Sequence, residues 1–261
     1  MTAAKIQITG LEKSYPSRAG EVLALRGVDL SVATGEFLTV VGPSGCGKST
    51  LLYILAGFLP PTAGDARVNG APVRGPGVDR GIVFQEYALF PWLTVFQNVT
   101  YGLEMKGVPR VEREEIARRY VKLIGLEGFE RRFPRELSGG MKQRVAIART
   151  LAYEPEILLL DEPFGALDAQ TRELMQDELA RIWEATGKTV VLITHDVSEA
   201  VYLSQRVAVM SRRPGRIVRE FPVDLGPRGS REEVVLSSGY TELRNRVWLA
   251  VRDEVLKADG A

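Results

Sequence analysis

The stretch that decides the fold is Glu36-Phe37-Leu38-Thr39-Val40-Val41-Gly42-Pro43-Ser44-Gly45-Cys46-Gly47-Lys48-Ser49-Thr50. It begins with an apolar run typical of a strand, which stops at Gly42. A glycine-punctuated loop follows, and residues 48–59 have the pattern of a helix. The order strand, G-x-x-x-x-G-K-S, helix predicts a phosphate-binding loop.

The residue types in this loop match that chemistry. Glycines let the backbone turn consecutive N–H groups toward one point, where the helix N-terminus adds its positive dipole end. We expect Lys48 to reach the β- and γ-phosphates of a nucleotide and the Ser49 hydroxyl to be a ligand of Mg²⁺. The alternative is a chance match to a short pattern. Cys46 is the single cysteine, and we interpret it as a tolerated small side chain rather than a nucleophile or metal ligand.

The bulk composition is that of an ordinary globular protein. Of 261 residues, 45% are hydrophobic and 26% charged, and the net charge is +1. This balance does not suggest nucleic acid as a general partner. One cysteine excludes an internal disulfide, and residues 1–7 lack an apolar signal core. No run approaches the length of a membrane span, so we expect the chain to stay in the cytoplasm.

The residues flanking the loop predict mostly strands. Lys5–Ile8 and Val28–Val32 alternate between apolar and polar residues, which predicts half-buried strands. Tyr15 closes the first of these, and it is either an aromatic at a strand end or a flat surface for a nucleotide base. Asn69-Gly70 predicts a hairpin turn. Gly81–Phe84 is a buried-strand candidate that ends at Gln85.

The next part of the chain predicts helices. Tyr87–Val99 is unusually apolar for a connection, and it is either core or a docking surface. Residues 104–136 resemble a helical insertion, with an amphipathic helix over 111–124. Leu137-Ser138-Gly139-Gly140 opens another helix over 141–151, with Ser138 as its N-cap. This start is a second candidate anion site, and a plain helix start is the alternative.

Two further aliphatic runs end in polar residues. Ile157–Leu160 predicts a strand buried on both faces, and it runs into Asp161 and Glu162. Because neighbouring strand side chains point to opposite sides, we expect one carboxylate to face a metal and the other a water. Thr189–Thr194 predicts another buried strand, which ends at His195, the only histidine. Ligands of open α/β sheets bind at such strand ends, although a lone histidine is usually structural.

The C-terminal region predicts two strands and a helix. Residues 206–210 and 216–221 read as strands around Pro214-Gly215, and residues 222–239 read as a loop. Residues 240–257 predict an amphipathic helix that packs through Leu243, Val247, Leu249 and Val251.

Together these residues resemble the ATP-binding subunit of an ABC transporter, over nearly the whole chain. The matching segments are Gly42–Ser49 (Walker A), Gln85 (Q-loop), Leu137–Gly140 (signature), Ile157–Glu162 (Walker B and catalytic glutamate), Gly165–Asp168 (D-loop) and His195 (switch histidine). Residues 75–85 and 161–168 are similar to the nitrate, sulfonate and taurine importer ATPases, and the first of these segments is most similar to the taurine branch.

The resemblance implies an α/β fold with a P-loop NTPase core and a mainly parallel sheet. To this core are added an N-terminal antiparallel β subdomain and an inserted α-helical subdomain. We expect residues 1–85 and 157–221 to form the core with the β subdomain, residues 86–156 the helical subdomain with the signature, and residues 222–261 a C-terminal extension.

The resemblance also implies roles for these residues. Two copies would pair head to tail around two ATP, each ATP lying between one P-loop and the partner's signature. Tyr15 would stack on adenine, Gln85 and Asp161 would join Ser49 at Mg²⁺, Glu162 would be the general base, and His195 would contact the γ-phosphate. The implied nucleotide-binding residues are Tyr15, Gly42, Pro43, Ser44, Gly45, Cys46, Gly47, Lys48, Ser49, Thr50, Ser138, Gly139, Gly140 and Asp168.

Two residues depart from the family pattern. Met141 stands where the signature usually has glutamine, and it cannot make the hydrogen bonds of glutamine. Gly165 begins the D-loop where many relatives have serine.

The implied function is ATP hydrolysis that drives solute import through a separate membrane permease, on the cytoplasmic face of the membrane, with an extracytoplasmic binding protein. The alternatives are a soluble non-transport ABC ATPase, an importer of a different small solute, an exporter, a P-loop kinase or GTPase, and a regulatory module without turnover. A kinase or GTPase leaves the signature and His195 without a purpose.

Overall fold

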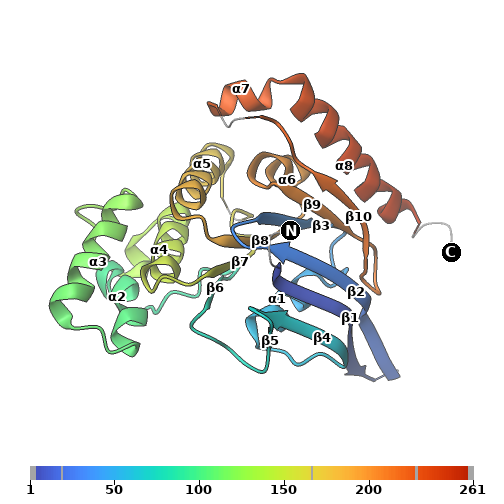
Figure 1. The fold of residues 1–261 in the computed structure, drawn as a ribbon. Coiled ribbons are helices and arrows are strands. Elements are labelled where there is room, and N and C mark those ends of the chain that lie inside the picture. Colours follow the sequence, from blue (N-terminus) through green and yellow to red (C-terminus); the bar gives the residue numbers. More distant parts are fainter. Residues whose placement is uncertain (1–3, 19, 166, 227–228, 258–261) are drawn as a thin grey trace. The chain divides into compact units, whose positions relative to one another are not determined.

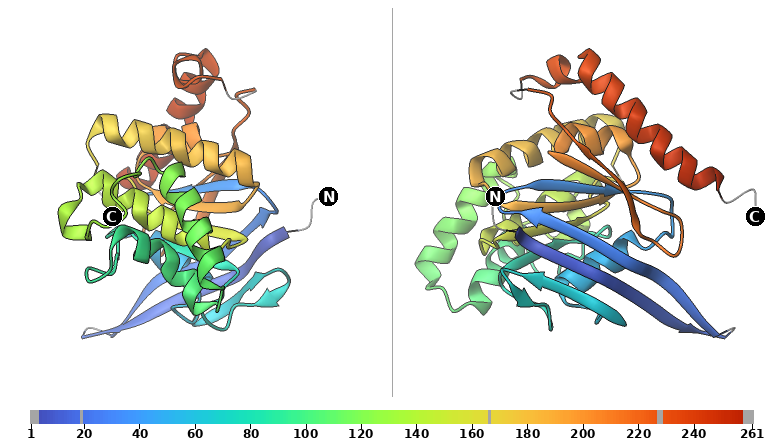
Figure 2. Two further views of the ribbon diagram at one scale, coloured as in Figure 1. Left: turned by 90° about the vertical axis from the view of Figure 1, so that its left-hand side faces the viewer. Right: turned by 45° about the vertical axis from the view of Figure 1, so that its right-hand side comes forward.

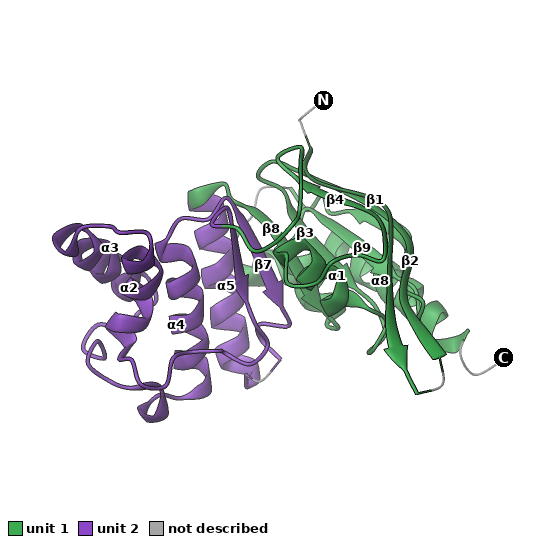
Figure 3. Ribbon diagram, turned by 90° about the horizontal axis from the view of Figure 1, so that it is seen from below, with its two compact units in different colours: residues 1–77, 186–261 green, residues 78–185 purple. Residues whose placement is uncertain are grey.

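The computed structural model describes residues 4–18, 20–165, 167–226 and 229–257 (Figure 1). The chain forms two compact units: the first contains residues 1–77 and 186–261, and the second contains residues 78–185 (Figure 3). Ala166, in the middle of the predicted D-loop, lies outside the described residues. The three-part division expected from the sequence stays a prediction.

The first unit contains most of the strands. Its elements are β1 (Ala4–Ser17), β2 (Gly20–Ala33), β3 (Phe37–Val41), α1 (Lys48–Ala56), β4 (Ala63–Val68), β5 (Ala71–Pro72), β8 (Thr189–Thr194), α6 (Val197–Leu203), β9 (Arg206–Met210), β10 (Ile217–Pro222), α7 (Arg231–Val235) and α8 (Ser238–Leu256).

Parallel pairing organises the centre of this unit. β3 pairs in parallel with β8 on one side and with β9 on the other, and β10 adds antiparallel to β9. Every residue of β3 and β8 is buried, as expected for parallel strands covered on both faces. The predicted buried strands over 37–41 and 189–194 are confirmed.

A separate antiparallel sheet has the strand order β2-β1-β4-β5. Its two long strands, β1 and β2, run side by side (Figure 2). Ile6 and Ile8 of β1 are buried while Gln7 is exposed, so the predicted alternation is confirmed. The predicted hairpin turn is also present between β4 and β5, where Asn69 and Gly70 have φ of 52° and 76°.

Helix α1 begins at Lys48 as predicted but ends at Ala56, earlier than expected. The reason is Gly57, which adopts a left-handed conformation with φ of 82° and closes the helix with an N–H bond to the Ile54 carbonyl. Leu51, Leu52 and Leu55 of this helix are fully buried.

The second unit is mainly helical. Its elements are β6 (Arg80–Val83), α2 (Val95–Met105), α3 (Arg110–Leu123), a 3₁₀ turn (Pro134–Glu136), α4 (Gly139–Ala152), β7 (Ile157–Asp161) and α5 (Ala169–Thr186). β6 and β7 pair in parallel, and β7 is entirely buried. The predicted helices over 111–124 and 141–151 and the buried strand over 157–160 are confirmed.

The prediction of a loop over 222–239 is wrong in part. Residues 231–235 form α7, because the Ser230 side chain and the Glu233 side chain make a reciprocal capping box at its start. α8 begins at Ser238, and Leu243 and Val247 are buried as predicted. Leu249, expected to pack, is 48% exposed because Ala250 and Glu254 continue the buried face instead.

None of the helices in the part of the chain that the structure describes combines the length and apolar composition needed to cross a membrane.

The tight end of α1 yields a stability prediction. A Cβ at Gly57 would lie 2.1 Å from the backbone of Gly75, in a left-handed conformation that already disfavours L-residues. We expect Gly57→Ala to lower the free energy of unfolding by about 3 kcal/mol or more, the sum of strain and overpacking. Gly70 has a similar φ of 76° with open space around it, so Gly70→Ala is the matched control and costs only about 1–2 kcal/mol. Thermal melts of both variants measure this, and equal melting temperatures would refute the packing argument.

Candidate nucleotide-binding and hydrolysis site

The predicted phosphate-binding loop is enclosed by backbone. A Cβ at Gly42 would lie 2.7 Å from the Met210 carbonyl oxygen, and one at Gly47 would lie 2.9 Å from the Ala24 carbonyl oxygen. Gly45 and Gly47 also have φ of 71° and 110°. This loop therefore requires glycine, as expected where the backbone approaches a ligand closely.

Lys48 places its charge inside the loop. The side chain is buried, and its Nζ donates to the carbonyl oxygens of Gly42 at 2.9 Å and Pro43 at 3.0 Å. The N-cap of α1 is Gly47, which has no side chain to satisfy the first N–H groups of the helix. A cation and a helix N-terminus thus lie at one place, and this combination suits a phosphate.

The Cys46 thiol is buried beside Lys48. Burial raises the pKa of the thiol, against a smaller lowering effect of the Lys48 charge. A protonated, buried thiol is a poor nucleophile, so the structure agrees with its interpretation as a tolerated side chain.

Tyr15 lies next to the start of α1. Its hydroxyl is 3.3 Å from Thr50 Oγ1, and the ring is half-buried. Lys13 Nζ lies 5.4 Å from the ring centroid, within the range of a cation–π contact. The first unit therefore brings Tyr15 together with Thr50 of the predicted binding set.

Strand register brings His195 to the same edge as the loop. Val41 is paired with Thr194 on the neighbouring parallel strand, so Gly42 and His195 both come directly after paired residues. His195 is exposed, and it precedes Asp196, which caps α6 through its side chain. Carboxyl ends of parallel strands are the usual ligand sites of α/β sheets.

The second unit brings Gln85, Asp161 and Glu162 together by the same rule. Val83 is paired with Leu160, so the residues that follow both strands leave at the same end. Asp161 is 2% exposed, whereas Gln85 is exposed.

We expected strand alternation to point the carboxylates of Asp161 and Glu162 to opposite sides, and this reason is wrong. β7 ends at Asp161, and Glu162 has φ of 44°, so the strand alternation does not extend to Glu162. A left-handed conformation for a residue other than glycine costs about 1–3 kcal/mol, and such strain is concentrated at functional sites.

The signature segment begins α4 as predicted. Ser138 is the N-cap, and its Oγ accepts from the Met141 N–H at 3.3 Å. A Cβ at Gly139 would lie 3.0 Å from Tyr87 Oη, and one at Gly140 would lie 2.5 Å from Thr171 Cγ2. The two glycines therefore allow close packing of this helix start against other segments of the second unit.

Asp168 directly precedes α5. Its carboxylate accepts from the Thr171 N–H at 3.0 Å, and this bond, followed by that of the Thr171 side chain, lowers the pKa of Asp168 below its usual value. The carboxylate is therefore ionised at neutral pH.

Arg149, which the sequence analysis did not single out, supports these segments. Arg149 of α4 donates to the Ala88 carbonyl oxygen at 2.7 Å and lies over the Phe90 ring. With Tyr87 against Gly139, this fastens the chain after Gln85 to the signature helix. These contacts join residues far apart in sequence, so no local pattern indicates them.

No group of three or more His, Cys, Asp and Glu side chains suited to a metal occurs among the described residues. The predicted Mg²⁺ ligands are instead a hydroxyl, an amide and one carboxylate. Oxygen donors in small number fit Mg²⁺, which usually keeps waters and binds nucleotide phosphates.

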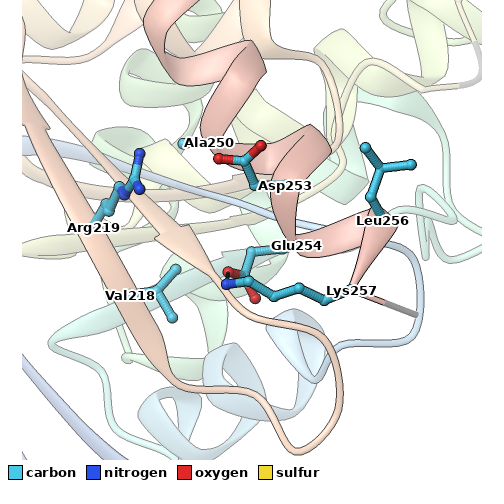
Figure 4. A pocket seen from close by; sticks show the side chains of 7 residues that line it. All are labelled: Val218, Arg219, Ala250, Asp253, Glu254, Leu256 and Lys257. Carbon is cyan, nitrogen blue, oxygen red and sulfur yellow. Dashed lines mark hydrogen bonds and ion pairs between the residues drawn. The ribbon is translucent and has the colours of Figure 1, made fainter. Parts of the chain in front are cut away.

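A further hollow of about 620 Å³ lies between β10 and α8 of the first unit (Figure 4). Val218 and Arg219 line it from the strand, and Asp253 and Glu254 line it from the helix. It contains none of the predicted site residues.

The chain matches the family described as ABC transporter over residues 25–165. It is 52% identical to an uncharacterised ABC transporter ATP-binding protein from Methanocaldococcus jannaschii, over 97% of this chain and 94% of that protein. It is also 52% identical to the nitrate import ATP-binding protein of Synechocystis, over 96% of this chain and 93% of that protein. It is 50% identical to the taurine import ATP-binding protein of Burkholderia pseudomallei, over 93% of this chain and 94% of that protein.

The fold also matches solved structures. A dimeric ATP-binding cassette in a post-hydrolysis state, bound to ADP and Pi, is 34% identical with a TM-score of 0.74, covering 86% of this chain and all of that one. The chain therefore belongs to the ABC transporter family, and the predicted α/β P-loop fold of its ATPases is confirmed. It is an ATPase of the kind coupled to membrane transport.

The packing at Gly140 yields a prediction with an internal rescue. We expect Gly140→Ala to displace the start of α4, because its Cβ would collide with Thr171 Cγ2 at 2.5 Å, and to lower the free energy of unfolding by about 1–3 kcal/mol. Thr171→Ser removes that methyl group and keeps the hydroxyl, so the double variant should recover most of the stability. Melting temperatures of both single variants and the double variant measure this. A double variant as unstable as Gly140→Ala alone would contradict the assignment.

Proposed function

We propose that two copies of this chain pair head to tail around two ATP and drive uptake of a small anion through a separate membrane permease. The observation that supports this most is the loop in which Lys48 donates to the Gly42 and Pro43 carbonyls, at a helix start capped only by glycine. The dimeric state of the related cassettes supports the pairing.

The P-loop holds the phosphates in this proposal. The backbone N–H groups of residues 42–50 and the Lys48 ammonium bind the phosphate oxygens, and Tyr15 stacks on the adenine. Ser49, Gln85 and Asp161 provide oxygen ligands for Mg²⁺, which neutralises charge on the phosphates when bound.

Hydrolysis uses residues that follow buried strands. Glu162 is the general base toward the attacking water, and its left-handed backbone is the kind of strain that is concentrated at functional sites. His195 contacts the γ-phosphate. Ser138, Gly139 and Gly140 of the partner copy present a helix N-terminus to that phosphate, and Asp168 lies in the segment between the two copies.

Two-fold pairing makes the two sites equivalent. The γ-phosphate then links the copies, and each charged hydrogen bond lost on hydrolysis is worth about 1.5–3 kcal/mol. Loss of a few such bonds moves a closed pair toward an open one. In this scheme residues 1–85 and 157–221 form the core with the β subdomain, residues 86–156 form the helical subdomain, and residues 222–261 form a C-terminal extension.

We assign the surface around Trp92 to the permease. Asn98 is fully buried, and its amide group holds residues 90–94 in place through bonds that include Leu93 O at 3.0 Å and Phe90 N at 3.0 Å. Phe90 packs against Trp92 with centroids 5.6 Å apart, yet Trp92 is 70% exposed. A rigid loop that presents an exposed aromatic suits a protein interface. The chain would thereby be peripheral to the cytoplasmic face of the membrane.

The docking assignment predicts a loss of assembly. We expect Trp92→Gln and Phe96→Gln together to abolish copurification with a coexpressed permease of the transporter, because they remove the exposed Trp92 ring and the half-buried Phe96 ring of the same apolar stretch. ADP binding should stay unchanged. Val111→Gln, at an apolar residue that is 81% exposed on α3, is the matched control and should copurify normally. Unchanged copurification of the Trp92 and Phe96 variant would reject this surface.

The proposed substrates are nitrate, taurine or another sulfonate. The support is the sequence identity of 52% to a nitrate import ATP-binding protein and of 50% to a taurine import ATP-binding protein. A strain that lacks the gene should fail to grow on one of these compounds as sole nitrogen or sulfur source. The intact gene should restore growth and Glu162→Gln should not, because uptake requires hydrolysis. Normal growth of the deletion strain on nitrate, taurine and alkanesulfonate would reject the substrate class.

A further inference from the structure

The turn between β9 and β10, residues 211–216, lies directly against the phosphate-binding loop. Arg213 Nε donates to the Gly45 carbonyl oxygen at 3.1 Å, across 168 positions of sequence. A Cβ at Gly215 would lie 2.2 Å from the Cys46 carbonyl oxygen. Turn and loop are thus in contact through their backbones as well as through the Arg213 side chain.

The turn is itself firmly held. The Ser211 hydroxyl donates to the Arg212 and Pro214 carbonyl oxygens at 2.9 and 3.1 Å and accepts from the Arg216 N–H at 3.1 Å. Both polar backbone groups of Gly215 bond to β2, with its N–H on Ala24 O at 2.8 Å and its carbonyl on Arg26 N at 3.0 Å. A turn anchored on both sides is a fixed support rather than a loose connection.

The Arg213 bond fixes the direction of one peptide group of the loop. In a trans peptide the carbonyl and the following N–H point in opposite directions. Holding the Gly45 carbonyl toward Arg213 therefore directs the Cys46 N–H toward the interior of the loop, where it is 3.3 Å from the Pro43 carbonyl oxygen. Gly45 has φ of 71° and the conformational freedom of glycine, so this peptide needs an external restraint.

We propose that residues 211–216 form a brace that holds the phosphate-binding loop in its binding shape, and that Arg213 is a positioning residue for the binding of a nucleoside diphosphate. The brace contacts the carbonyl side of the Gly45–Cys46 peptide, opposite the N–H side. Arg213 therefore acts on the nucleotide through the loop. This inference rests on the proposed role of the loop in binding phosphates.

A brace of this kind affects binding more than turnover. A loop held in shape before binding loses little conformational entropy when the phosphates bind, whereas a loosened loop must be ordered at that step. Once nucleotide occupies the loop, its own bonds hold the same shape. Removal of the Arg213 bond should therefore weaken nucleotide affinity and leave the rate at saturation nearly unchanged.

The test is calorimetric titration of ADP with the full chain, together with ATPase kinetics. We expect Arg213→Ala to raise the ADP Kd about 3–10-fold, the range for loss of one hydrogen bond, with kcat within about twofold. Arg213→Lys keeps a cationic donor and should recover part of the affinity. Arg212→Ala removes the same charge from the same turn, at an exposed side chain, and should bind ADP like the wild type.

The outcomes separate this inference from the proposed function. If Arg213→Ala binds ADP as tightly as Arg212→Ala and the wild type do, the proposed brace is refuted. An equal weakening by both variants would assign the effect to net charge and would also overturn it. A wild-type chain that binds no ADP would instead reject the nucleotide site itself.

Discussion

The backbone of the phosphate-binding loop lies so close to its neighbours that side chains are excluded where they meet. Gly42 faces the Met210 carbonyl, Gly47 faces Ala24 and Leu25, and Gly215 faces the Cys46 carbonyl, each closer than a Cβ allows. Such packing restricts the loop where it meets these neighbours, and the Lys48 ammonium lies against the Gly42 and Pro43 carbonyls at the start of α1. Within the first unit, Tyr15 and Thr50 lie at the start of α1, and His195 follows the strand paired with β3.

Within each unit, parallel pairing determines which candidate residues come to the same strand edge. Within the first unit the register of β3 and β8 brings Gly42 and His195 to one edge, and within the second unit the register of β6 and β7 does the same for Gln85 and Asp161. Buried strands have little freedom to shift, because a slip of one residue would exchange the packed faces. The residues that directly follow these strands are therefore held in place by the strand pairing, although they make no ladder pairs themselves.

Much of this arrangement could be predicted because its signals are local. Runs of aliphatic residues identified β3, β7 and β8, and the G-x-x-x-x-G-K-S pattern identified the loop and α1. Helix α6, which the sequence analysis did not predict, is only seven residues long and starts with the Asp196 cap, so periodicity gave little signal. The missed α7 is shorter still, although Ser230 and Glu233 form a capping box that could have revealed it. The strained backbone of Glu162 and the contact of Arg213 with Gly45 depend on tertiary packing, and no spacing rule encodes them.

The central claim is that each ATP is held between the P-loop of one copy and the signature of another. The most direct measurement is sedimentation velocity of Glu162→Gln, a variant that should keep nucleotide without hydrolysing it, in saturating ATP and in saturating ADP. The account predicts a dimer with ATP and a monomer with ADP, and it predicts that adding Ser138→Arg abolishes the dimer while ADP affinity stays unchanged. A Glu162→Gln variant that remains monomeric at saturating ATP, or that dimerises equally with ADP, would contradict the account.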